Sequence, residues 1–175
     1  MFSVKAERET WVSRSWRPPY PRHILNSFLG PFVTFIVLEG LTVATNFPWL
    51  NGSFGAAVVI MYAIPTSVAA IPRHVIGGQV LSAVTASAFA YALPAPSSTW
   101  IRSSLSVAVS TMLMKVIGIS YPPGGATAYI IAHQPLSMVS FFYLMFPLII
   151  GSCILIVFTI VFEKFRRKKY PSIWL

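Results

Sequence analysis

The sequence predicts an all-α fold, a polytopic membrane helix bundle of about five transmembrane helices plus one re-entrant half-helix. Two observations lead to this prediction. First, 55% of the 175 residues are hydrophobic and only 10% are charged, and the mean hydropathy is +0.70, so there is too little polar surface to cover a soluble core. Second, five apolar runs approach or exceed the ~20 residues that a helix needs to cross a bilayer.

Basic residues are concentrated at the two ends of the chain. We therefore expect a basic interfacial N-terminal arm at residues 1–23, a transmembrane domain at 24–163 and a basic C-terminal tail at 164–175. Basic residues beside apolar spans set topology and attract anionic lipid, so the net charge of +9 indicates a lipid bilayer as the partner and not nucleic acid. The basic residues of the two ends are Lys5, Arg8, Arg14, Arg17, Arg22, Lys164, Arg166, Arg167, Lys168 and Lys169.

The five predicted crossings are bounded by Pro, Gly or polar residues. They are residues 24–44, 53–70, 75–93, 100–119 and 141–162. Five crossings would place the two basic tails on opposite sides of the membrane, whereas the positive-inside rule favours the same side for both. The sequence leaves this conflict open: either one run does not cross, or one tail is translocated.

Small residues lie four apart along the third run, at Gly78, Ser82, Ala86 and Ala90. Residues four apart share one face of a helix, so this strip allows another helix to approach closely. We interpret it as a packing surface. A pore-lining role for Ser82 and Thr85 is the alternative.

A short irregular segment separates the last two predicted crossings. Pro122 and Pro123 remove two backbone donors, and Gly124 and Gly125 free the backbone, so an unwound stretch is expected before a short helix at 126–132. Seven helical residues span only ~10 Å of a hydrocarbon core that is ~30 Å thick. The segment is therefore expected to enter the membrane without crossing it. Irregular backbone at that depth is buried in protein or lines a cavity.

Several cationic side chains are expected near this segment. The third and fourth crossings return the chain to its starting side. Arg73, His74 and Lys115 are therefore expected at the same side of the membrane as Gly124 and Gly125. A helix that restarts at Ala126 would offer free backbone N–H groups and a partial positive charge, which suit an anion. This arrangement is similar to transporters whose broken helices point their N-termini at anionic substrates. Two simpler roles remain open, namely snorkelling for Lys115 and a loop charge for Arg73.

Residues 71–83 and 121–127 resemble the two signature motifs of the HPP family of small integral membrane proteins. The resemblance covers most of the chain from the first crossing onward and implies a compact helical membrane domain. Some plant and cyanobacterial members are associated with nitrite movement across organellar or cell membranes. We therefore expect an organellar inner membrane, of a mitochondrion or plastid, in preference to the plasma membrane.

Two positions differ from the usual family motifs. The first residue of the His-Pro-Pro motif is Tyr121 here. The other motif usually reads Arg-Asn followed by Gly-Gly-His, and this chain has His74 and Gln79 at the Asn and His places. Neither tyrosine nor glutamine titrates near neutral pH in water, so a proton-transfer step could not use these two positions.

Two classes of function remain open. One is a transporter or channel for a small anion such as nitrite. The other is a non-transporting structural or accessory subunit of a larger membrane complex, such as a mitochondrial respiratory complex. In either class we expect a homo-oligomer or assembly with other subunits. The residues predicted to bind the substrate are Arg73, His74, Lys115, Tyr121, Gly124, Gly125, Ala126 and Thr127.

The inventory of reactive side chains argues against an enzyme. The chain has no Asp and only four Glu residues, which are too scattered for an acid–base pair. Its three His residues lack the spacing of a metal site. We therefore expect no catalytic residue, no cofactor and no metal.

Overall fold

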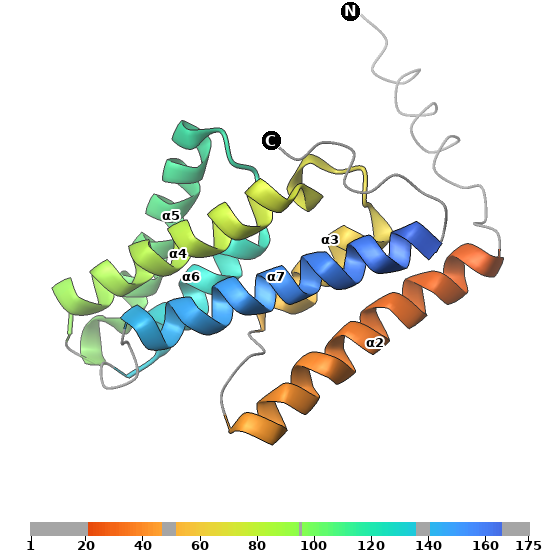
Figure 1. Cartoon of the computed structure of the whole chain (residues 1–175). Coiled ribbons are helices and arrows are strands. Elements are labelled where there is room, and N and C mark those ends of the chain that lie inside the picture. The colour runs from red at the N-terminus through yellow and green to blue at the C-terminus, as the bar shows by residue number, and fades with distance from the viewer. Residues whose placement is uncertain (1–20, 47–51, 95, 136–140, 166–175) are drawn as a thin grey trace, which may run out of the picture.

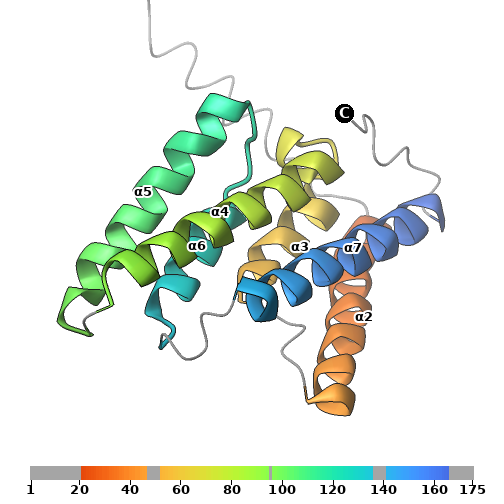
Figure 2. The same ribbon diagram turned by 60° about the vertical axis from the view of Figure 1, so that its left-hand side comes forward.

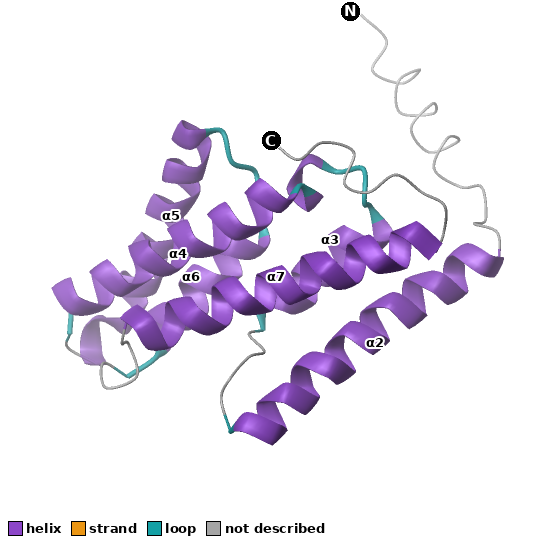
Figure 3. Ribbon diagram, viewed as in Figure 1, coloured by secondary structure: helices purple, strands orange, loops and turns teal. Residues whose placement is uncertain are grey.

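The computed structural model describes residues 21–46, 52–94, 96–135 and 141–165. Within these residues the regular structure is helical (Figure 3), which confirms the predicted all-α fold of a polytopic membrane protein. Most of the predicted N-terminal arm and C-terminal tail lies outside the described residues. The helices are α2 (Pro21–Thr45), α3 (Ser53–Ala63), α4 (Pro72–Ala92), α5 (Thr99–Ile117), α6 (Pro123–His133) and α7 (Phe141–Phe165), with short 3-10 helices η1 (Val68–Ala70) and η2 (Pro96–Ser98).

Four of these helices, α2, α4, α5 and α7, are long and apolar enough to cross a membrane. They correspond to the first, third, fourth and fifth predicted crossings. The start of α4 is earlier than predicted, because proline has no N–H to lose at the first helical position and Pro72 begins the helix. Arg73 and His74 therefore lie in the first turn of α4 and not in the predicted connecting loop.

The second predicted crossing, at residues 53–70, is wrong as a single helix. α3 ends at Ala63 after 11 residues. Proline at position 65 disfavours the helical conformation of the residue before it, and Ile64 has the non-helical angles φ −131° and ψ 59°. The chain then turns before η1, so this apolar run contains one short helix and a break.

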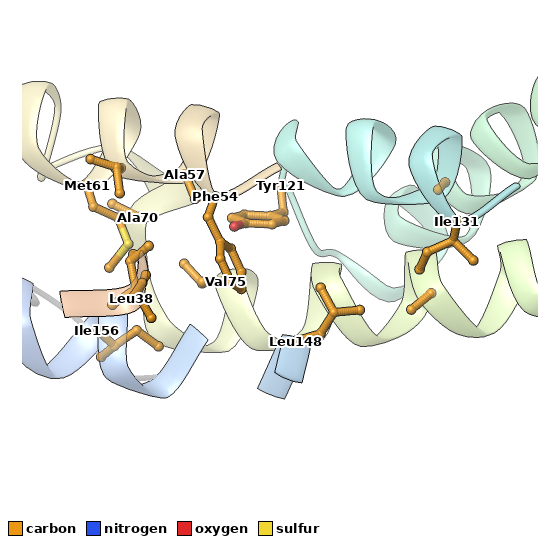
Figure 4. Packing of buried hydrophobic residues seen from close by; sticks show 14 of the residues in the cluster. Leu38, Phe54, Ala57, Met61, Ala70, Val75, Tyr121, Ile131, Leu148 and Ile156 are labelled. Atoms are coloured by element: carbon orange, nitrogen blue, oxygen red, sulfur yellow. The ribbon is translucent and has the colours of Figure 1, made fainter. Parts of the chain in front are cut away.

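α4 lies at the centre of the bundle. It packs against α5, α6 and α7, while α6 also contacts α5 and α3, and α2 contacts α3 and α7 (Figures 1 and 2). The small residues predicted to form a packing strip on α4 are buried, which confirms that this face meets other helices: Gly78, Ser82, Ala86 and Ala90. Figure 4 shows Phe54 of α3, Val75 of α4 and Tyr121 close together in the apolar core.

The N-terminal half of α2 meets the C-terminal half of α7. Gly30 faces the ring of Tyr62 and lies close to Phe162, and the Tyr62 and Phe162 rings pack edge to face with centroids 5.6 Å apart. The Tyr62 hydroxyl also shares a hydrogen bond of 2.8 Å with Thr34 of α2. The start of α2 and the end of α7 thus lie at the same end of the bundle, and the positive-inside rule favours this arrangement for two basic tails.

The segment from Gly118 to His133 runs from one end of the bundle to the other. Near its start, the backbone N–H of Ser120 donates to His74 Nδ1 at the N-terminal end of α4 (2.8 Å). Near its end, the carbonyl of Ala132 accepts a bond from Arg102 Nε in the first turn of α5 (2.6 Å). A re-entrant segment would instead return to the end at which it entered. At 11 residues, or about 16 Å, α6 covers only part of this path, and the unwound stretch before it covers the rest.

This path predicts where introduced cysteines are accessible. Ser120 and His133 are both exposed, and the contacts above place them at opposite ends of α4 and α5. Ser120→Cys and His133→Cys are therefore expected to react with a membrane-impermeant maleimide from opposite sides. Pro94→Cys, just after α4, is the control and should react from the same side as His133→Cys. Same-side labelling of positions 120 and 133 would restore the re-entrant path.

Candidate functional site

An open groove of about 560 Å³ lies where the start of α4, the end of α5 and the start of α6 meet. Its lining mixes polar and apolar side chains from residues far apart in the sequence. Binding sites between the helices of a bundle are commonly built in this way. The lining residues are Val68, His74, Thr111, Met114, Lys115, Gly118, Ile119, Ser120, Tyr121, Pro122 and Gly125.

Half of the predicted substrate-binding residues line this groove, namely His74, Lys115, Tyr121 and Gly125. The structure therefore brings together residues that the sequence placed at one membrane face. The other four predicted residues do not line the groove. Arg73 and Ala126 are exposed outside it, while Gly124 and Thr127 are buried between α4 and α6.

His74 is held in one orientation by the backbone beside it. Its Nδ1 atom accepts the Ser120 N–H at 2.8 Å, and only 4% of the side chain is exposed. A nitrogen that accepts a hydrogen bond carries no proton, so the neutral ring carries its proton on Nε2. His74 therefore fixes the unwound stretch before α6 and keeps one N–H donor at a residue of the groove lining.

The start of α6 differs from the predicted start of the half-helix, and so do the backbone N–H groups near it. α6 begins at Pro123 and not at Ala126, because proline suits the first helical turn. The two prolines have no N–H, and the N–H groups of Gly124 and Gly125 donate to the carbonyls of Tyr121 (3.0 Å) and Pro122 (3.1 Å). The prediction of an unwound Pro122–Gly125 stretch that presents donors to an anion is therefore wrong.

Gly124 and Gly78 instead allow close packing between α4 and α6. A Cβ atom on Gly124 would lie 2.5 Å from Met114 Cε, 2.6 Å from Ser82 Oγ and 3.1 Å from the Gly78 carbonyl. A Cβ atom on Gly78 would lie 2.5 Å from the Cβ of Tyr121. A side chain at either position would therefore force its neighbours to shift, so glycine fits these two close contacts best.

Four polar side chains, which we call the Gln79 cluster, are buried behind the groove: Ser53, Gln79, Tyr121 and Thr127. Gln79 Nε2 donates to Ser53 Oγ (3.1 Å) and to the Tyr121 hydroxyl (3.3 Å). Gln79 Oε1 accepts a short hydrogen bond from the Thr127 hydroxyl. The cluster thus joins α3, α4, the segment before α6 and α6 itself through one amide group.

Tyr121 belongs to both the groove and the Gln79 cluster. It lines the groove, yet only 2% of its surface is exposed, and its hydroxyl accepts a bond from Gln79. Tyr121 and Gln79 are the two positions that differ from the usual histidines of the family motifs, and the structure shows that they touch. Sequence reasoning included Tyr121 and Thr127 in the site but missed Ser53 and Gln79; the available signal was an amide side chain inside an apolar helix.

Four membrane-length helices around a buried polar cluster define an integral, polytopic helical membrane protein. Residues 17–171 match the family described as HPP, transmembrane region, and the chain belongs to this family. It is 34% identical over 167 residues to one Dictyostelium discoideum transmembrane protein and 31% identical over 153 residues to a second one. The alignments cover 90% and 86% of this chain but only 59% and 49% of those relatives. No solved structure matches the chain.

Proposed function

We propose that this protein is a transporter or channel for a small anion such as nitrite. The observation that supports the proposal is the junction between the groove and the Gln79 cluster at Tyr121. Polar residues inside a membrane domain are costly to bury and often mark substrate pathways. Here Tyr121 lines a groove that also contains a lysine and a histidine, and its hydroxyl accepts a hydrogen bond from Gln79 in the centre of the bundle.

Lys115 supports an anionic substrate. Its side chain is exposed and lies two residues before the end of α5, at the groove. A positive charge in this position raises the local concentration of anions and their rate of entry, and salt weakens the effect. The role proposed for Lys115 is thus attraction at the entrance, while the polar groups deeper in the bundle are uncharged.

Nitrite flux into proteoliposomes tests this role. Lys115→Met is expected to lower flux at subsaturating nitrite and low salt by roughly tenfold, and the difference should shrink as ionic strength rises. Lys164→Met is the matched control, because Lys164 is an exposed lysine near the end of α7 that does not line the groove. Equal flux in the two variants would show that the groove is not part of the transport pathway. No anion flux in the unmutated protein would contradict transport and leave the accessory-subunit hypothesis.

A further inference from the structure

The hydrogen bond between Ser120 and His74 is one that only a neutral imidazole can make. The Ser120 N–H donates to His74 Nδ1 at 2.8 Å, whereas a protonated ring carries a hydrogen on both nitrogens and accepts at neither. His74 lines the open groove, and histidine is the side chain that ordinarily titrates between pH 5 and 8. Uptake of one proton would therefore break the bond and leave two N–H groups facing each other, one on Nδ1 and one on Ser120.

Ser120 lies in a stretch of backbone that can shift when this bond breaks. Residues 119–121 lie outside both α5 and α6, and Gly118 before them has the left-handed angle φ 74° at the end of α5. Ser120 is exposed and lines the groove. A small displacement of residue 120 would thus leave both N–H groups at the groove, where an anion with two oxygen atoms can accept a hydrogen bond from each.

A protonated His74 would have no counter-ion among the described residues beside it. Its charged neighbours are Arg73, which precedes it on α4, and Lys115 of α5, which shares the groove, and both are cations. Tyr121 is the other titratable group in the lining, and its hydroxyl accepts a hydrogen bond from Gln79. No carboxylate is among the described residues that line the groove. Because nearby like charges oppose protonation, a negative ion bound in the groove is what would make it favourable.

We propose that the groove binds a proton together with the anion, and that His74 takes up the proton. This inference rests on the proposed transport function. The proton comes from water to Nδ1, and the anion then bridges the Nδ1–H and the Ser120 N–H, which replaces the bond that protonation breaks. The two binding events are linked, so the proton raises the affinity for the anion by the same factor as the anion raises the affinity for the proton. A pH gradient can then drive nitrite across the membrane.

Asparagine at position 74 separates the titrating proton from the hydrogen bond. Its amide oxygen is as many bonds from the backbone as Nδ1 of histidine and can accept the Ser120 N–H, but the amide does not titrate. His74→Asn is therefore expected to keep a Tm near that of the unmutated protein at pH 8 and to lose the proton site. His133→Asn is the matched control, because His133 is an exposed histidine at the end of α6 that does not line the groove.

Nitrite binding to the purified full chain in detergent tests the proton site. The rise in Tm on addition of nitrite is measured at pH 5 and at pH 8, against nitrite-free protein at the same pH and ionic strength. The apparent affinity of the unmutated protein and of His133→Asn is expected to be roughly tenfold higher at pH 5, a typical factor for linked sites. His74→Asn should bind nitrite equally at both pH values. Affinity that is independent of pH in the unmutated protein, or a pH dependence that survives in His74→Asn, would overturn the proposal.

Flux into proteoliposomes separates failure of the proton site from failure of transport. After subtraction of the leak into protein-free liposomes, an acidic outside and a neutral inside should accelerate nitrite uptake by the unmutated protein but not by His74→Asn. Acid-dependent binding that His74→Asn abolishes, without any flux, would contradict transport and support the proton site. Flux that responds to the pH gradient equally in both proteins would overturn the proton site, while transport itself would stand.

Discussion

Gly124→Val is expected to destabilise the folded protein by about 3 kcal/mol or more, the upper range for overpacking a close-packed core. The first added atom alone would lie 2.5 Å from Met114 Cε and 2.6 Å from Ser82 Oγ. The methionine end can move, but the Gly78 carbonyl at 3.1 Å is backbone of the central helix and cannot. α6 must therefore shift away from α4, which strains the Gln79–Thr127 bond. Thermal unfolding in detergent and size-exclusion profiles would measure the loss.

Gly125→Val is the matched control for this prediction. The nearest atom to a Cβ on Gly125 is Val107 Cγ1 at 4.0 Å, an ordinary contact distance. The substitution should therefore leave the Tm near that of the unmutated protein. It should narrow the groove, which Gly125 lines, and so lower flux without unfolding. Equal destabilisation by the two substitutions would show that the α4–α6 contact is not the close approach described above.

The contrast between these neighbouring glycines shows the limit of sequence reasoning at the site. Composition and run length were sufficient to locate α2, α4, α5 and α7, because each is a continuous apolar run of membrane length. They failed at α3, because the run from 53 to 70 is apolar on both sides of the short Pro65-Thr66-Ser67 segment that marks its break. They also failed at the start of α6, because a Pro-Pro-Gly-Gly sequence is compatible both with an unwound loop and with a proline-initiated helical turn.

The buried half of the site depends on contacts that no local pattern contains. The partners of Gln79 lie 26 residues away at Ser53 and 48 residues away at Thr127. Which helix meets α4 at that point is decided by the close approach at Gly78 and Gly124, and so by tertiary packing. By contrast, the proximity of His74, Lys115 and Gly125 could be predicted, because two successive crossings must return the chain to the same face.

Arg102 is a second residue whose importance only the structure reveals. It is 4% exposed in the first turn of α5. Its Nε donates to the Ala132 carbonyl at 2.6 Å, and Nη1 donates to the Leu93 carbonyl at 3.4 Å. The Ala132 carbonyl belongs to the last turn of α6 and has no partner within that helix, and a cation is favourable at the C-terminal end of a helix dipole. Arg102 therefore connects the ends of α4 and α6 to the start of α5.

Arg102→Met is expected to lower the free energy of unfolding by about 1–3 kcal/mol, because it leaves the Ala132 carbonyl without its donor while keeping most of the side-chain volume. The Leu93 carbonyl keeps the Ser98 hydroxyl as a second donor. Arg102→Lys should recover only part of the loss, since one ammonium group on a flexible stem cannot reproduce the rigid fork that reaches both carbonyls. Arg73→Met is the matched control at an exposed position in the first turn of α4 and should change the Tm little. The measurement is thermal unfolding of the three variants in one detergent.

A lysine variant as stable as the unmutated protein would mean that charge alone stabilises this end of the bundle. A methionine variant as stable as Arg73→Met would mean that water satisfies the Ala132 carbonyl, and that α5 is held to α6 by apolar packing.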